Sequence, residues 1–184
     1  MSAVSRPDVR VRFEPLAALV WSIRTASTLP RARHCVTLEF TTAIWRHQMN
    51  VDGGCLCGAI KYQAVLDPER CAICHCKNCQ VNSGTAFGWI VHIHNRQFEL
   101  TSGRLKVFET IADSGRRRCL SFCGDCGTRI HAQTLEEPDA FFGLRAGTVR
   151  QRHLLAPKQQ VWCRSAQPWA FDLPKIPRKE IQDR

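Results

Sequence analysis

Seven of the eleven cysteines in this sequence stand in short pairs or in a short triplet. Only one or two residues separate neighbours within these groups, which is too tight a spacing for a framework of disulfides between them. Thiolates at such spacings are typical ligands of zinc, which binds sulfur in a tetrahedral arrangement. The cysteines concerned are Cys55, Cys57, Cys74, Cys76, Cys79, Cys123 and Cys126. The sequence therefore predicts metal chemistry, with two Zn²⁺ per chain.

Four of these cysteines form two pairs that lie far apart in the chain. Cys55 and Cys57 make the first pair, and Cys123 and Cys126 follow after 65 intervening residues. A glycine comes directly after each pair and permits a tight turn, so the two pairs together predict one closed, structural four-cysteine site. Metal binding there is expected to contribute directly to folding. The competing interpretation is four free buried thiols.

The other three cysteines, Cys74, Cys76 and Cys79, lie within six residues. Three protein ligands leave the fourth position of zinc open to water or to an incoming thiolate, and this open position distinguishes a catalytic zinc from a structural one. These three are therefore candidate catalytic residues as well as metal ligands. A structural alternative stays open, in which a fourth protein ligand closes the site. The candidates for that ligand are Cys71, His75 and Cys119.

Other basic and imidazole side chains are interpreted as having no part in the chemistry. Consecutive residues of an extended loop alternate in direction, so His75 is expected to point away from the metal. His92 and His94 share one face of a predicted strand, and a solvated strand end is favoured over a metal site. The basic run at residues 116–118 is expected to form a solvated loop.

Composition bounds the partners and the compartment. Twenty-six Lys and Arg against 16 Asp and Glu give a formal charge of +10, but two zinc ions with seven thiolates would carry about −3 and offset part of it. Nucleic acid is therefore not expected as a partner. No apolar stretch reaches the roughly 18 residues of a membrane span, so no membrane association is expected. Thiols at metal-binding spacings indicate a reducing compartment, the cytoplasm.

The elements that must position these cysteines are mainly β. Short runs of β-forming residues between turn dipeptides predict strands, and the only helix expected is a turn or two after Cys76. The predicted strands span residues 59–65, 87–93, 97–100, 105–111, 129–134 and 141–149. An irregular C-terminal segment follows, with Trp162 and Trp169 expected to cover an edge of the core.

The chain is expected to hold one domain, because 184 residues suffice for one well-buried core. This domain is placed at residues 49–177, with residues 178–184 as a frayed tail. Residues 1–48 carry seven Arg and no Lys and are predicted to be a disordered N-terminal extension or an artefact of the assigned start site. A targeting peptide is a third interpretation. Cys35 has no partner at ligand spacing and is not a site residue.

Several motifs resemble the glutathione-dependent formaldehyde-activating enzyme and centromere protein V family, over about residues 51–177. They are Gly53-Gly54-Cys55-Leu56-Cys57-Gly58, Cys74-His75-Cys76 with Cys79, and Phe122-Cys123-Gly124-Asp125-Cys126-Gly127. The resemblance implies a β-tent zinc fold in which the four-cysteine group holds a structural zinc and the triplet holds the catalytic one. It also implies carbon-sulfur lyase chemistry, in which glutathione and formaldehyde combine as S-hydroxymethylglutathione.

The function expected from these observations is a zinc-dependent carbon-sulfur lyase-like enzyme acting on adducts of a small thiol, such as glutathione, with a small aldehyde. Residues 80–82 lack a basic residue that family members often carry, and Cys71 is an extra thiol beside the triplet. The identity of the thiol therefore rests on analogy alone. The alternative is a non-catalytic zinc module that binds a macromolecular partner through its basic surface. An open or closed fourth coordination position distinguishes the two.

Overall fold

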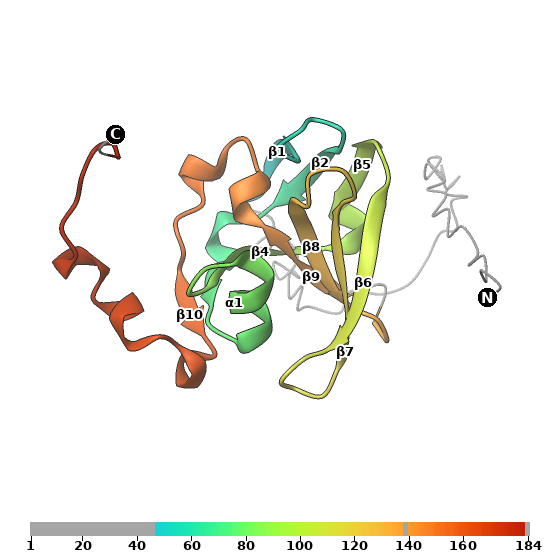
Figure 1. The fold of residues 1–184 in the computed structure, drawn as a ribbon. Helices are drawn as coiled ribbons and strands as arrows, with labels where there is room; N and C mark the ends of the chain where they lie inside the picture. Colours follow the sequence, from blue (N-terminus) through green and yellow to red (C-terminus); the bar gives the residue numbers. More distant parts are fainter. Residues whose placement is uncertain (1–46, 138–139, 183–184) are drawn as a thin grey trace, which may run out of the picture. The chain divides into compact units, whose positions relative to one another are not determined.

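The computed structural model describes residues 47–137 and 140–182 (Figure 1). This part of the chain is mainly β, with two sheets, one α-helix and short 3₁₀ turns, which confirms the predicted fold class. Cys35 and residues 1–46 of the predicted N-terminal extension lie outside the described residues, so the predicted division into segments stays a prediction. The strands are β1 (Met49–Gly54), β2 (Lys61–Leu66), β3 (Cys71–Cys74), β4 (Gly88–His94), β5 (Phe98–Ser102), β6 (Leu105–Ile111), β7 (Arg117–Cys123), β8 (Arg129–Thr134), β9 (Phe141–Arg145) and β10 (Gln159–Val161), and the helix is α1 (Lys77–Ser83).

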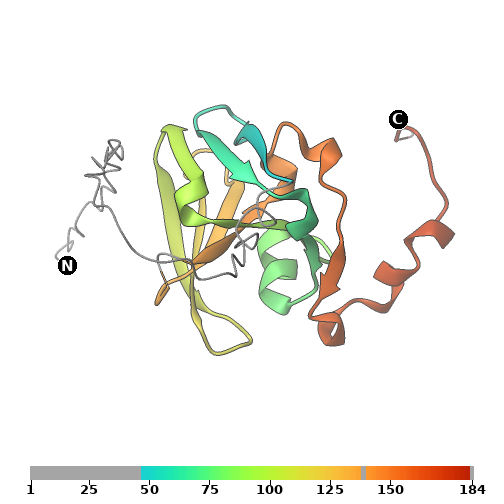
Figure 2. The same ribbon diagram turned by 180° about the vertical axis from the view of Figure 1, so that it is seen from behind.

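The strands pair into a small and a large sheet. β1, β2 and β5 form a three-stranded antiparallel sheet, and the seven-stranded sheet has the order β10-β3-β4-β9-β8-β7-β6. Neighbours in the large sheet are antiparallel, except that β10 runs parallel to β3. Cys74 ends β3 opposite Gly88 of β4 and Val161 of β10. Figures 1 and 2 show α1 beside β10 from both sides, so the helix that follows Cys74 stays near this edge.

Four strands are missing from those predicted from the sequence, namely β1, β3, β7 and β10. β3 is buried along nearly its whole length and so lacks the alternation that marks a half-buried strand. β7 begins in the basic run that suggested a loop. The predicted strand at residues 141–149 is too long, because β9 ends at Arg145 and a 3₁₀ turn, Ala146–Thr148, follows.

The helical turns predicted after Cys76 form α1. Cys76 is its N-cap, with extended backbone and a sulfur that accepts a hydrogen bond from the N–H of Cys79 at 3.3 Å. Gly84 ends the helix in the left-handed conformation, with φ of +67°, as glycine commonly does. One candidate ligand thus starts the helix, and a second lies in its first turn.

The main core draws buried side chains from both sheets. Its largest members are Ile60, Tyr62, Leu66, Ile93, Ile130, Phe142 and Leu144. Gly53 lies so close to this core that a Cβ there would approach the Tyr62 ring to 2.3 Å. A smaller cluster around Cys74 is covered by Trp162, as expected, whereas Trp169 is 51% exposed and the same expectation is wrong for it.

Within the described residues, no helix has both the length and the apolar character needed to cross a membrane.

Candidate functional site

The first cysteine cluster connects an element of each sheet. Cys55 and Cys57 lie in the connection between β1 and β2, Cys123 ends β7, and Cys126 lies in the turn before β8. All four sulfur atoms lie within 4.8 Å of one another, and those of Cys57 and Cys123 are 3.8 Å apart. The structure therefore brings together the four residues that the sequence grouped, in an arrangement able to bind a metal ion.

Two turns and one threonine preform this cluster. Gly58 and Gly127 follow the cysteine pairs with positive φ, which glycine adopts without strain. The hydroxyl of Thr128 accepts a hydrogen bond from the N–H of Leu56 at 3.1 Å and so ties the two turns together. The same hydroxyl lies 3.2 Å from the sulfur of Cys126 and is the main cause that lowers the pKa of this thiol to about 5. The thiolate, which is the form that binds metal, is thereby favoured.

The second cluster lies where β3 ends and α1 begins. Cys74 ends the strand, Cys76 caps the helix and Cys79 lies in its first turn, so their sulfur atoms all come within 4.8 Å of one another. Cys74 is buried and the other two are half-buried. Three thiols in this arrangement fit zinc, which prefers sulfur ligands over the oxygen ligands of hard cations. This cluster too is able to bind a metal ion, with three ligands rather than four.

None of the three candidates for a fourth ligand belongs to this cluster. Cys71 is fully buried, and its thiol donates a hydrogen bond to the carbonyl of Leu155 at 3.1 Å. The ring of His75 turns toward Gln160, with 2.8 Å between its Nε2 and the amide oxygen. Cys119 lies on β7 outside both clusters. Within the described residues, no fourth side chain joins the three sulfur atoms of this cluster.

A buried arginine that the sequence does not single out faces the triplet. Arg145, the last residue of β9, is only 8% exposed, and its Nη1 lies 3.9 Å from the sulfur of Cys79. Gly88 makes room for it, since a Cβ there would lie 2.5 Å from Nη1 and 3.2 Å from the sulfur of Cys79. Hydrogen bonds from Cys74 and Cys76, assisted by the charge of Arg145, lower the pKa of Cys79. The surroundings of Cys79 therefore favour its thiolate form.

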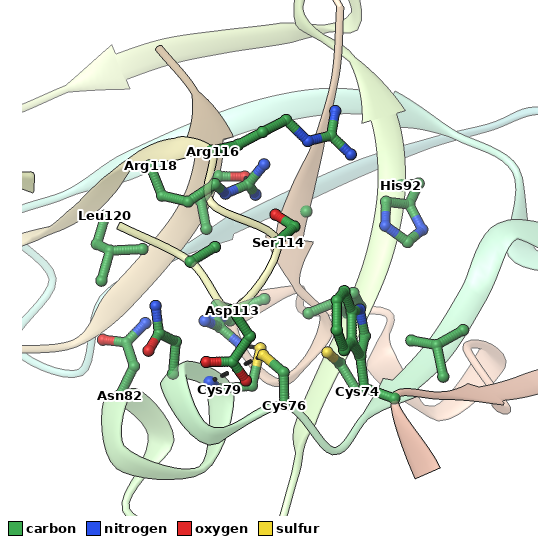
Figure 3. Close-up of a pocket in the computed structure, with 18 residues that line it drawn as sticks. Cys74, Cys76, Cys79, Asn82, His92, Asp113, Ser114, Arg116, Arg118 and Leu120 are labelled. Carbon is green, nitrogen blue, oxygen red and sulfur yellow. Dashed lines mark hydrogen bonds between the residues drawn. The ribbon is translucent and has the colours of Figure 1, made fainter. Parts of the chain in front are cut away.

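The triplet opens into a pocket of about 240 Å³ (Figure 3). In this view the three sulfur atoms lie at one side of the pocket, and the side chains of Arg116 and Arg118 lie at the other. Asp113 is the one carboxylate among the lining residues, and Arg145 supplies a third guanidinium. The apolar part of the lining includes Ile90, Leu120, Val161 and Trp162. The metal-binding side of the pocket thus faces a strongly basic one.

The expectation of a solvated loop at residues 116–118 is wrong for Arg118. This residue lies on β7 and is half-buried, and its guanidinium donates hydrogen bonds to the carbonyl of Ala132 at 2.9 Å and to the hydroxyl of Thr134. A signal for this was present in the sequence. Arg118 and Leu120 are two residues apart, so on a strand they share the face that Leu120 buries.

The two strand histidines also differ from the expectation of a solvated strand end. His92 is half-buried in the pocket lining, and burial lowers its pKa, which favours the neutral imidazole. His94 instead caps the 3₁₀ turn Asn95–Gln97, where its ring accepts a hydrogen bond from the N–H of Arg96 at 3.2 Å. In the described residues, neither histidine belongs to a cluster able to bind a metal.

One comparison with known proteins, a match to a family model, covers the whole cysteine pattern. The family model described as "Glutathione-dependent formaldehyde-activating enzyme" matches residues 50–165, which include both clusters and more than half of the chain. A crystal structure of a protein from Rhodobacter sphaeroides is similar to this chain, with 18% sequence identity, a TM-score of 0.48, and coverage of 60% of this chain and 99% of that one. No curated protein sequence matches. From the family match and the seven cysteines it spans, the chain belongs to the glutathione-dependent formaldehyde-activating enzyme family.

Proposed function

We propose that this chain is a zinc-dependent carbon-sulfur lyase-like enzyme that combines a small thiol, such as glutathione, with a small aldehyde, such as formaldehyde. The observation that carries the proposal is the triplet of Cys74, Cys76 and Cys79, which opens into a pocket and lacks a fourth ligand from the described residues. Membership of a formaldehyde-activating family supports the reaction class. The particular thiol and aldehyde belong to the proposal.

In this proposal both clusters hold zinc. Cys55, Cys57, Cys123 and Cys126 would hold a structural Zn²⁺, and Cys74, Cys76 and Cys79 a catalytic one. Both donor sets consist of soft sulfur atoms, which select zinc over magnesium or calcium. Zinc bound at the triplet supplies the Lewis acidity that favours ionisation of a coordinated thiol at neutral pH.

The chain's own residues would bind the substrate thiol and stabilise its thiolate form. The sulfur of the substrate forms a bond to the aldehyde carbon, the carbonyl π bond breaks, and the thiol proton ends on the former carbonyl oxygen. The reverse reaction breaks the same carbon-sulfur bond. Arg118 and Arg145 place positive charge in the pocket, which favours the thiolate. The apolar lining around Leu120 and Trp162 reduces the access of water, which strengthens these electrostatic interactions.

The non-catalytic alternative predicts a closed second cluster and an exposed basic surface, and neither matches the contacts of the described residues. A closed second site would use Cys71 as fourth ligand, but the Cys71 thiol donates to the carbonyl of Leu155 and lies outside the cluster. A basic binding surface would use the run at residues 116–118, but Arg118 lines the pocket. Steep salt dependence of nucleic-acid binding is the result that would favour this alternative.

The working domain and the compartment are part of the same proposal. We place the domain at residues 49–177, beginning at the first residue of β1. All ten cysteines of the described residues are free, which suits a reducing compartment such as the cytoplasm. Disulfides found in protein whose free thiols are alkylated at the moment of cell lysis would argue against this compartment.

The test is consumption of glutathione and formaldehyde by the purified full chain. We expect turnover in the wild type and its loss in Cys79→Ser, which removes one sulfur of the triplet. Cys119→Ser is the matched control, because Cys119 belongs to neither cluster, and its turnover should equal that of the wild type. Equal turnover in all three proteins, or none in a wild type that holds its metals, would overturn the proposal.

A further inference from the structure

We propose that Arg118 is a specificity-determining residue that binds a carboxylate of the substrate, so that the pocket selects thiols that also carry a carboxylate. Arg116 and Arg145 assist by adding positive charge to the same pocket. The inference rests on the proposed function, because it takes the triplet as the place where the substrate sulfur binds. It goes further by naming the second group that the thiol must carry.

The pocket contains guanidinium groups without carboxylate partners. Within the described residues, no ion pair includes Arg118 or Arg145. Arg145 is 8% exposed, and its Nε is buried without a hydrogen-bond partner. Asn82 of α1 lines the same pocket, and its side-chain oxygen is also buried without a partner. Buried charges and polar groups are costly unless they are paired. The guanidinium groups therefore indicate an anionic ligand, and the Asn82 oxygen, which only accepts hydrogen bonds, indicates a donor group on the same ligand.

Arg118 is held in place but retains free donors. Two of its hydrogen bonds go to Ala132 and Thr134, at the base of the pocket wall on β8. A guanidinium has five N–H donors in a planar fork, so three remain, and this fork matches a carboxylate better than it matches a sulfur atom. Its orientation is therefore fixed by the protein before any ligand binds.

The three arginines of the pocket differ in what already faces their charge. Zinc with three cysteine thiolates and one substrate thiolate would carry a charge of −2, and Asp113 adds −1, against the +3 of the three arginines. Arg145 lies next to that centre, with Nη1 3.9 Å from the sulfur of Cys79. Asp113 accepts a hydrogen bond from the N–H of Lys77 at 3.4 Å, and Arg116 pairs with Glu137 only at the exposed rim, where such pairs contribute little. Within the described residues, Arg118 is thus the guanidinium of the pocket that has neither an ion pair nor a contact with a sulfur of the triplet.

The test uses protein loaded with Co²⁺, whose absorption spectrum reports binding of a thiol without requiring turnover. The probes are 3-mercaptopropionate and its neutral counterpart 3-mercaptopropan-1-ol. We expect the wild type to bind the acid at least about tenfold more tightly, as charge-assisted hydrogen bonds to carboxylates typically allow. Arg118→Gln should reduce this preference to less than about threefold. Arg117→Gln is the matched control, since Arg117 is the adjacent exposed residue of β7 and pairs with Glu109 at 3.1 Å.

The outcomes separate this inference from the proposed function. Spectral changes with both thiols and no preference for the acid would overturn the carboxylate subsite and leave the proposed function standing. Absence of any spectral change with either thiol would overturn the subsite, and absence with glutathione as well would also overturn the proposed function. An equal loss of preference in Arg117→Gln and Arg118→Gln would also overturn the subsite, since it would show a general effect of surface charge. The wild-type comparison holds even if Arg118→Gln fails to fold, and Arg118→Lys then tests the fork, with an expected loss of preference.

Discussion

Replacing the two cysteines between β1 and β2 should destabilise the fold far more than their exposure suggests. Cys57 is exposed and Cys55 half-buried, and surface substitutions usually change stability by about 0.5 kcal/mol or less. With a metal in the first cluster, however, these side chains fasten the small sheet to Cys123 of the large one. The double variant Cys55→Ser/Cys57→Ser removes that fastening.

The size of the effect follows from the loop that the metal closes. Between Cys57 and Cys123 lie 65 residues. The chain-entropy relation for cross-links gives a stabilisation of about 4 kcal/mol for a loop of this length at 25 °C. In a domain of this size, that loss lowers the midpoint of thermal unfolding by about 10 to 20 °C.

The assay is thermal unfolding of the full chain followed by circular dichroism in buffer containing zinc. Cys163→Ser is the control, because Cys163 is exposed and outside both clusters, and its midpoint should stay within about 2 °C of the wild type. A chelator should lower the wild-type midpoint more than that of the double variant. A double variant that unfolds at the same temperature as Cys163→Ser would refute the metal cross-link.

Three further predictions follow from single positions. Gly88→Ala places a Cβ 2.5 Å from Nη1 of Arg145, so it should displace this guanidinium from Cys79. We expect kcat to fall by about tenfold or more. Unchanged kcat in a folded variant would show that the contact between Arg145 and Cys79 is dispensable. Cys71→Ala should leave the metal content per chain unchanged, as measured by atomic emission, because the Cys71 thiol bonds to Leu155; loss of one metal would identify Cys71 as a ligand. Burial lowers the pKa of His131 to about 4, against about 6.5 in the unfolded chain. The free energy of unfolding therefore has its full value, as far as His131 is concerned, above pH 6.5 and falls by about 3 kcal/mol as the pH drops to 4. Urea unfolding at pH 7 and pH 5 should show a smaller loss of unfolding free energy at the lower pH in His131→Phe than in the wild type. An equal loss in the two proteins would contradict the assignment.

Both cysteine clusters could be predicted from the sequence because short spacings bring two or three sulfurs together in each pair or triplet, and zinc needs four ligands in all. Cys74, Cys76 and Cys79 are joined by so few residues that a strand end and a helix start suffice to gather them. The glycines after the distant pairs likewise indicated the turns that the structure shows. Strands with one buried face could also be predicted, since the alternation of apolar and polar residues is local in the sequence.

The basic side of the pocket depends on long-range strand pairing, so most of it could not be predicted from the sequence. Arg145 reaches Cys79 only because β9 pairs with β4, with Arg145 opposite Ile90, and because Gly88 leaves space there. No local pattern of the sequence encodes that register. Arg118 is different, since its spacing from Leu120 places both residues on one face of a strand. The prediction of a loop at residues 116–118 missed this relation.

The catalytic role of the triplet is tested most directly by the number of zinc ions per chain in the wild type and in Cys76→Ser, measured together with turnover of glutathione and formaldehyde in the same preparations. We expect two zinc ions in the wild type and about one in the variant, with turnover lost, since the four-cysteine cluster keeps its metal. Two zinc ions without turnover in the wild type, or turnover that survives in Cys76→Ser, would contradict the claim that the triplet of Cys74, Cys76 and Cys79 is the catalytic centre.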